Sequence, residues 1–122
     1  MDLTVFSEKI HEGNRKKGFY DGGDKQLGTM LMLVVSELGE ALEAHRHSLK
    51  ADLTYYEGIL NAKHDFQTAF KEAIKDTVED EIADAIIRLL DLCGYYHIDI
   101  QKHIDLKLKY NQTRGYRHGK EY

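Results

Sequence analysis

Apolar residues recur at intervals of three and four along most of the chain, which is the spacing of amphipathic helices. The pattern predicts four main helices, at residues 4–17, 25–47, 65–94 and 99–112. Their expected caps are Thr4, Asp65 and Asp99, and Gly94 is expected to end the third helix. Residues 48–64 predict a connection with a short helix at about 53–60. Because strand patterns are nearly absent, we expect an all-α four-helix bundle.

Two stretches are apolar on nearly every side of their helices. Residues 30–35 contain no polar side chain, and residues 82–93 contain only three charged ones. A helix that is apolar all round is buried in a bundle or at a subunit interface. The chain has 122 residues, which fits one domain with a modest core. We therefore expect a single domain over residues 1–122 that assembles into an oligomer.

Carboxylates occur in pairs, three residues apart, within these apolar helices. Glu37 and Glu40 follow the first stretch, and Glu81 and Asp84 lie at the start of the second. Side chains at i and i+3 of a helix have Cβ atoms roughly 5–6 Å apart, so each pair can share one cation. A buried carboxylate is costly unless it is paired or metal-bound, and a cluster without a cation takes up protons. Because oxygen ligands without thiolates suit Mg²⁺ or Mn²⁺, we predict that the four acids bind such a cation.

Other chemistries have weaker support. Acidic pairs are also common on solvated helices, and Arg88, four residues after Asp84, could simply neutralise that acid. No Glu-x-x-His pair, phosphate-binding glycine loop, Ser/His/Asp signature or Cys/His zinc spacing accompanies the acids. The single cysteine, Cys93, excludes an intrachain disulfide.

The net charge of −4 is unevenly distributed. Residues 105–122 carry five basic and two acidic side chains, so an acidic body is followed by a basic end. Within this end, Lys107 and Asn111 share a helix face and Arg114 follows, and such groups can bind polyphosphate oxygens. The alternatives are a disordered, solvated terminus and a nucleic-acid contact with stacking tyrosines, which the acidic body disfavours.

The expected location is the cytoplasm. Residues 1–14 lack the basic start and apolar core of a secretory signal. The longest apolar run, residues 30–35, is too short to span a bilayer, so no membrane partner is expected.

Three segments, in this order, carry a resemblance to a known family: "SELGEALEAHR", "KDTVEDEIADAIIRLLDLCGYYHIDI" and "KLKYNQTRGYRHGKEY". They resemble the MazG-like all-α nucleoside triphosphate pyrophosphohydrolases, and the likeness extends from about Asn14 to Tyr122. It implies an oligomeric bundle, a homodimer or homotetramer, of the all-α NTP pyrophosphatase type. It also implies Mg²⁺-dependent hydrolysis of an NTP or dNTP to the monophosphate and pyrophosphate.

The resemblance also implies roles for individual residues. The metal ligands would be Glu37, Glu40, Glu81 and Asp84, and Glu37 or Glu40 would orient the water that attacks the α-phosphorus. The substrate contacts would be Lys107, Tyr110, Asn111 and Arg114, with Lys17 and with Phe19 or Tyr20 at the base. His118, Gly119 and Lys120 match the family's ending without an assigned role.

Two departures from the family pattern affect metal number and substrate range. Ser36 stands where many members have glutamate, and the connection over residues 41–80 is longer than usual. The alternative functions are a phosphoribosyl-ATP pyrophosphohydrolase-like enzyme and a non-catalytic helical module that binds a protein partner or nucleic acid.

Overall fold

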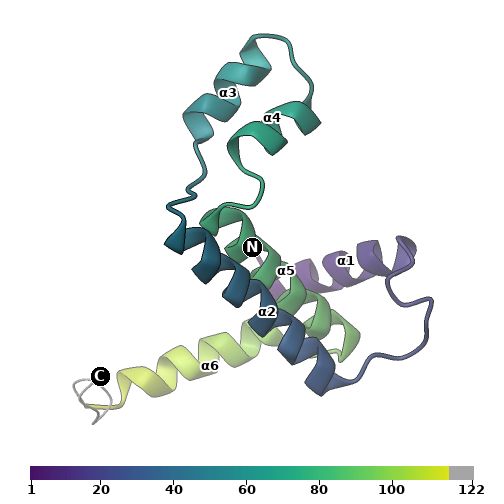
Figure 1. The fold of residues 1–122 in the computed structure, drawn as a ribbon. Coiled ribbons are helices and arrows are strands. Elements are labelled where there is room, and N and C mark those ends of the chain that lie inside the picture. Colours follow the sequence, from purple (N-terminus) through teal and green to yellow (C-terminus); the bar gives the residue numbers. More distant parts are fainter. Residues whose placement is uncertain (116–122) are drawn as a thin grey trace. The chain divides into compact units, whose positions relative to one another are not determined.

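A computed structural model describes residues 1–115, and this part of the chain is helical, without strands (Figure 1). Its helices are α1 (Leu3–Lys16), α2 (Leu27–Arg46), α3 (Leu53–Asn61), α4 (Phe66–Ala73), α5 (Val78–Tyr95) and α6 (Ile100–Gln112). The predicted all-α class is confirmed for these residues. His118, Gly119 and Lys120 lie outside them. Within the described range, every helix is too short or too polar to cross a membrane.

The chain divides into two compact units, and α5 contributes to both. The first contains residues 1–24 and the chain from residue 90 onward, and the second contains residues 25–89. In the first unit, Thr4 joins α1 to α6. Its Oγ1 donates to Asp99 Oδ1 at 2.7 Å and accepts from the Gln101 backbone N–H at 3.0 Å. The prediction that Thr4 caps α1 is therefore wrong, and the cap is Asp2.

Gly94 does not end its helix as predicted but lies within α5. A Cβ atom at this position would lie 2.6 Å from the Ser7 carbonyl oxygen and 2.6 Å from His11 Cβ. Ser7 is fully buried in α1. The missing side chain therefore lets α1 approach the C-terminal end of α5.

Gly94→Ala is expected to destabilise the protein by about 1–3 kcal/mol, because the new methyl group meets backbone that cannot rotate away. Gly39→Ala is the matched control, since Gly39 lies within α2 with no atom near its added Cβ. There, alanine is expected to stabilise the protein by about 0.5–1 kcal/mol. Urea unfolding of both variants measures the difference, and equal effects would contradict this explanation.

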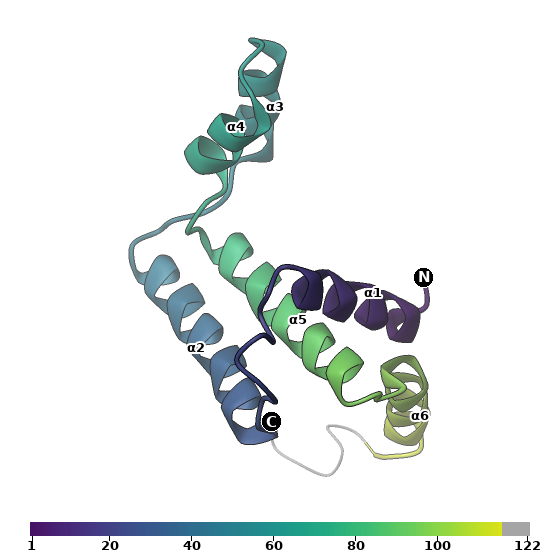
Figure 2. The same cartoon turned by 90° about the vertical axis from the view of Figure 1, so that its right-hand side faces the viewer.

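In the second unit, α2 and α5 run side by side in opposite directions (Figures 1 and 2). The buried residues of α2 recur at steps of four and three: Met30, Val34, Glu37, Ala41 and Ala44. On α5, this unit buries Glu81 and Ala85. Residues at this spacing form a narrow buried stripe along each helix, called the seam below. The seam of α2 contains Glu37, and the seam of α5 contains Glu81.

Residues 65–94 were predicted to form one helix, but they form two. The break lies between α4 and α5, where Asp76 has a φ of 64°. Thr77 Oγ1 accepts from the Asp80 backbone N–H at 3.3 Å, and Asp80 Oδ2 accepts from the Asp76 N–H at 2.9 Å. The Thr77 side chain thereby satisfies one N–H group that the new helix start leaves unpaired, and Asp80 binds the backbone just before the helix.

The connection between α2 and α5 forms a helical hairpin. The predicted short helix at 53–60 is confirmed as α3, which packs against α4 through Ile59, Ala69 and Ala73. Backbone hydrogen bonds close the base of the hairpin, from Val78 N–H to the Leu49 carbonyl and from Asp52 N–H to the Ala73 carbonyl, both at 3.0 Å.

Apolar side chains remain exposed along one flank of the α2–α5 pair. On α2 these are Leu31, Val35, Leu38 and Leu42, and on α5 they are Ile82, Ile86 and Leu89, all between 42% and 52% exposed. Because an α-helix turns about 100° per residue, each set forms a stripe along one side of the buried seam of its own helix. Because the helices are antiparallel, both sets face the same way, and Glu40 and Asp84 lie on the opposite flank. Much of the predicted core face is thus uncovered in a single chain.

Candidate metal centre

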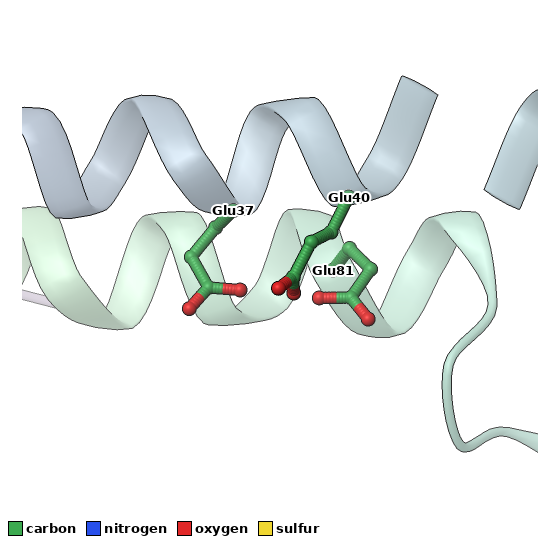
Figure 3. A group of neighbouring side chains, drawn as sticks. All are labelled: Glu37, Glu40 and Glu81. Carbon is green, nitrogen blue, oxygen red and sulfur yellow. The ribbon is translucent and has the colours of Figure 1, made fainter. Parts of the chain in front are cut away.

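Three glutamates from two helices meet where α2 faces α5. Glu37 and Glu40 extend from α2, and Glu81 extends from α5 toward them (Figure 3). Each offers one carboxylate oxygen, and these three oxygens lie within 4.8 Å of one another. Glu37 and Glu81 are buried, with 8% and 7% of their surface exposed, whereas Glu40 is exposed. The predicted convergence of acids from the two helices is therefore present for these three residues.

Glu81 is the least compensated member of the group. Its Oε2 atom is buried and has no hydrogen-bond partner. Burial, followed by the neighbouring Glu40 carboxylate, raises the pKa of Glu81 to about 7. A buried carboxylate oxygen without a donor costs free energy that a bound cation would recover.

Glu37 has a partner of its own. Arg88 Nε donates to Glu37 Oε1 at 2.8 Å, and this hydrogen bond lowers the pKa of Glu37. Arg88 was also expected to neutralise Asp84: its charge does act to lower the pKa of Asp84, but its hydrogen bond goes to Glu37 on α2. Arg88 therefore offsets one acid of the group and leaves Glu40 and Glu81 for another cation.

Asp84 belongs to neither acidic group that the described residues form. Burial, followed by the charge of Asp80, raises its pKa. The second group consists of Asp76, Asp80 and Glu81, at the beginning of α5. Asp84 as a metal ligand stays a prediction.

The donor set fits a hard divalent cation. All three ligands of the first group are carboxylates, and none is a thiolate or imidazole. Such oxygen ligands suit Mg²⁺ and Mn²⁺. The buried, unpartnered Glu81 oxygen is a position where a cation would replace a missing donor.

The predicted substrate-binding residues lie in the first unit. On α6, Lys107 Nζ lies 5.3 Å and Arg114 Cζ 5.6 Å from the centroid of the Tyr110 ring, so two cations gather over one exposed aromatic side chain. Asn111 follows Tyr110 near the end of the helix. Lys17 is the C-cap of α1, and Phe19 is exposed rather than part of the core.

A polar network in the first unit was not predicted. Asp91 accepts from the Tyr20 hydroxyl at 2.7 Å, and its other oxygen lies 3.0 Å from His11 Nδ1. Tyr20 stacks on Tyr95, whose hydroxyl donates to Asp24 at 3.0 Å. Burial and the bond to Asp91 raise the pKa of Tyr20. These hydrogen bonds and ring contacts hold the segment after α1 against the end of α5.

Comparisons with known protein families, curated proteins and solved structures find no match for this chain. The resemblance to MazG-like enzymes therefore stays a prediction from the motifs. The functional proposal rests on the chemistry of the acidic group.

Proposed function

We propose that this protein is a Mg²⁺-dependent nucleotide pyrophosphohydrolase that converts an NTP or dNTP to the monophosphate and pyrophosphate. The observation that supports it most is the buried, unpartnered oxygen of Glu81 beside Glu37 and Glu40. Such a group binds a divalent cation, and a triphosphate is the common biological partner of Mg²⁺ held by a few carboxylates.

In this proposal the acids have different roles. Glu37, Glu40 and Glu81 hold the cation, together with Asp84 from the next turn of α5. A bound Mg²⁺ supplies charge neutralisation at the phosphate oxygens. Because Arg88 occupies an oxygen of Glu37, the exposed Glu40 is better suited to orient the attacking water and accept its proton.

The other proposed roles concern contacts with the substrate. Lys107, Asn111 and Arg114 bind phosphate oxygens and stabilise the departing pyrophosphate. The exposed Phe19 ring is available to stack on the base, with Lys17 nearby in sequence.

The proposed assembly is a homodimer in which two α2–α5 pairs meet through their exposed apolar flanks and complete a four-helix bundle. Leu38→Glu, in the middle of the flank, is expected to convert the dimer to a monomer of 14.1 kDa by light scattering. Met32→Glu is the control, because Met32 is as exposed but lies on another side of α2. A wild-type monomer would contradict the assembly.

Pyrophosphate release from a panel of NTPs and dNTPs, with and without Mg²⁺, tests the function. We expect release with Mg²⁺ and none after chelation. Phosphoribosyl-ATP belongs in the panel, because its exclusive use would identify the alternative enzyme. An absence of release from every substrate would contradict the proposal and favour the non-catalytic module.

A further inference from the structure

Arg88 is a basic side chain that the structure places against the acidic group. It lies seven residues after Glu81 on α5, which is nearly two full turns, so both side chains leave the same face of the helix. Its Nε atom donates to Glu37 Oε1 on α2 at 2.8 Å. Arg88 and the three glutamates belong to the second unit, whereas Lys107 and Arg114 lie in the first. A cation of the protein itself is therefore fixed beside the proposed metal ligands.

The bond to Glu37 uses only one part of the Arg88 guanidinium group. This group is planar and carries several N–H donors in a fixed fork, of which Nε supplies one. Within the described residues, the two terminal nitrogens of Arg88 have no hydrogen-bond partner. The Arg88 side chain is 43% exposed, whereas the Glu37 side chain is 10% exposed. The bond therefore fixes the guanidinium at the acidic group and leaves its terminal N–H donors for a ligand from solvent.

The terminal donors of Arg88 match the oxygens of a phosphate group. Arginine binds phosphate through parallel N–H···O bonds, and such charge-assisted bonds are roughly twice as strong as neutral ones. Neutralising Glu37 requires only the Nε bond, and a lysine would supply the same charge. The planar fork, held by one nitrogen and open at the others, is suited to bind a polyphosphate beside the cation.

The position of Arg88 relative to Glu40 indicates which phosphates it would meet. Glu37 lies at one end of the acidic group, and Glu40 and Glu81 lie together at the other (Figure 3). Arg88 binds the group at its Glu37 end. In phosphoryl transfer, the attacking and leaving oxygens lie roughly in line on opposite sides of the phosphorus. Because the proposed water attacks beside Glu40, the pyrophosphate departs toward Arg88.

We propose that Arg88 binds the pyrophosphate part of the substrate and stabilises its charge as it departs, an inference that rests on the proposed function. Attack of the water oxygen on the α-phosphorus breaks the bond from that phosphorus to the oxygen that bridges to the β-phosphate. The bonding pair stays on this bridging oxygen, and the water proton goes to Glu40. The terminal N–H groups of Arg88 donate to oxygens of the leaving pyrophosphate, where negative charge increases.

Isothermal titration calorimetry of the full chain with inorganic pyrophosphate, at saturating Mg²⁺, tests this contact. Arg88→Gln is expected to bind pyrophosphate about 10–100-fold more weakly than the wild type, the range for lost hydrogen bonds to charged groups. Arg88→Lys keeps a charge beside Glu37 but replaces the planar fork with one ammonium group. It should bind pyrophosphate roughly 5-fold more weakly. Pyrophosphate affinity within about twofold of the wild type in either variant would overturn the proposal.

Binding of Mg²⁺ alone separates this contact from a merely structural role. The Mg²⁺ affinity should not fall in either variant, because Arg88 offers no cation ligand and its charge opposes that of a bound cation. An equal loss of Mg²⁺ and pyrophosphate affinity would mean that Arg88 only holds Glu37 in place, which contradicts the proposal. Arg46→Gln is the control: Arg46 also pairs with a glutamate of α2, Glu43, in the same unit, and the variant should keep wild-type pyrophosphate binding.

The outcome is separable from the proposed function. Weaker pyrophosphate binding with retained Mg²⁺ binding in the Arg88 variants supports the contact even if no nucleotide is hydrolysed. Wild-type pyrophosphate binding in these variants, together with Mg²⁺-dependent pyrophosphate release, overturns the contact and leaves the function in place. A wild type that binds Mg²⁺ but no pyrophosphate also overturns the contact.

Discussion

Glu40→Gln is expected to lower the rate of pyrophosphate release by about 10²–10⁴-fold, the range for loss of a positioned general base. The amide keeps the size of the side chain but cannot accept the proton of the attacking water, and it removes one charge from the cation site. Because Glu40 is exposed, the fold should tolerate the change. The free energy of unfolding without metal should stay the same or rise, since repulsion with Glu81 is lost.

Glu43→Gln is the matched control for this variant. Glu43 lies three residues further along α2 and is also exposed, but it pairs with Arg46 and His47 rather than with the acidic group. Its rate should stay within about twofold of the wild type if the effect is specific to the site. Full activity of Glu40→Gln would remove the assigned role of this residue.

Without metal, the protein is expected to become less stable as the pH rises from about 5 to 8. Between the ordinary pKa of 4.5 and the folded-state pKa of about 7, Glu81 keeps a proton in the folded state that the unfolded state has released. Stability then falls with rising pH. The rise of the Glu81 pKa from 4.5 to about 7 corresponds to roughly 3 kcal/mol of folding free energy, at about 1.36 kcal/mol per pKa unit. The lowered pKa of Glu37 has the opposite effect on stability. That effect changes only at pH values below the ordinary Glu pKa of 4.5, which is outside the range from pH 5 to 8.

Urea unfolding at several pH values, for the wild type and Glu81→Gln, measures this effect. The variant should lose most of the decrease and exceed the wild type in stability at pH 8. Mg²⁺ at 100 times its Kd should stabilise the wild type by about 2.7 kcal/mol. At one fixed Mg²⁺ concentration the stabilisation should be larger at pH 8 than at pH 6, because protonated Glu81 competes with the cation. Parallel pH profiles of the two proteins would exclude Glu81 as the source.

Helix positions were largely predictable because the buried face of a helix appears in the sequence as apolar residues three and four positions apart. The limits of α2 and α6 differ from the predicted ones by no more than two residues. The break before α5 was missed, although Thr77 and Asp80 have the spacing of a capping box. The apolar pattern continues through this break, so periodicity alone joined two helices.

The candidate site was predictable in composition but not in pairing. The i, i+3 spacing indicated that Glu37 and Glu40 share a face, and the structure adds Glu81 from the other helix. Spacing also suggested Asp84 as the partner of Arg88, whereas the side chain reaches Glu37. Contacts between distant segments, such as that of His11 with Asp91, leave no spacing in the sequence from which to predict them.

The closed base of the α3–α4 hairpin has a consequence for how such a chain can evolve. Leu49 and Val78 are joined by a backbone hydrogen bond, so the segment between them leaves and re-enters the α2–α5 pair at nearly one point. The hairpin also has a small core of its own. An ancestral chain could therefore gain or lose this segment as a module without disturbing the glutamates, because insertions whose ends meet are the ones that folds tolerate.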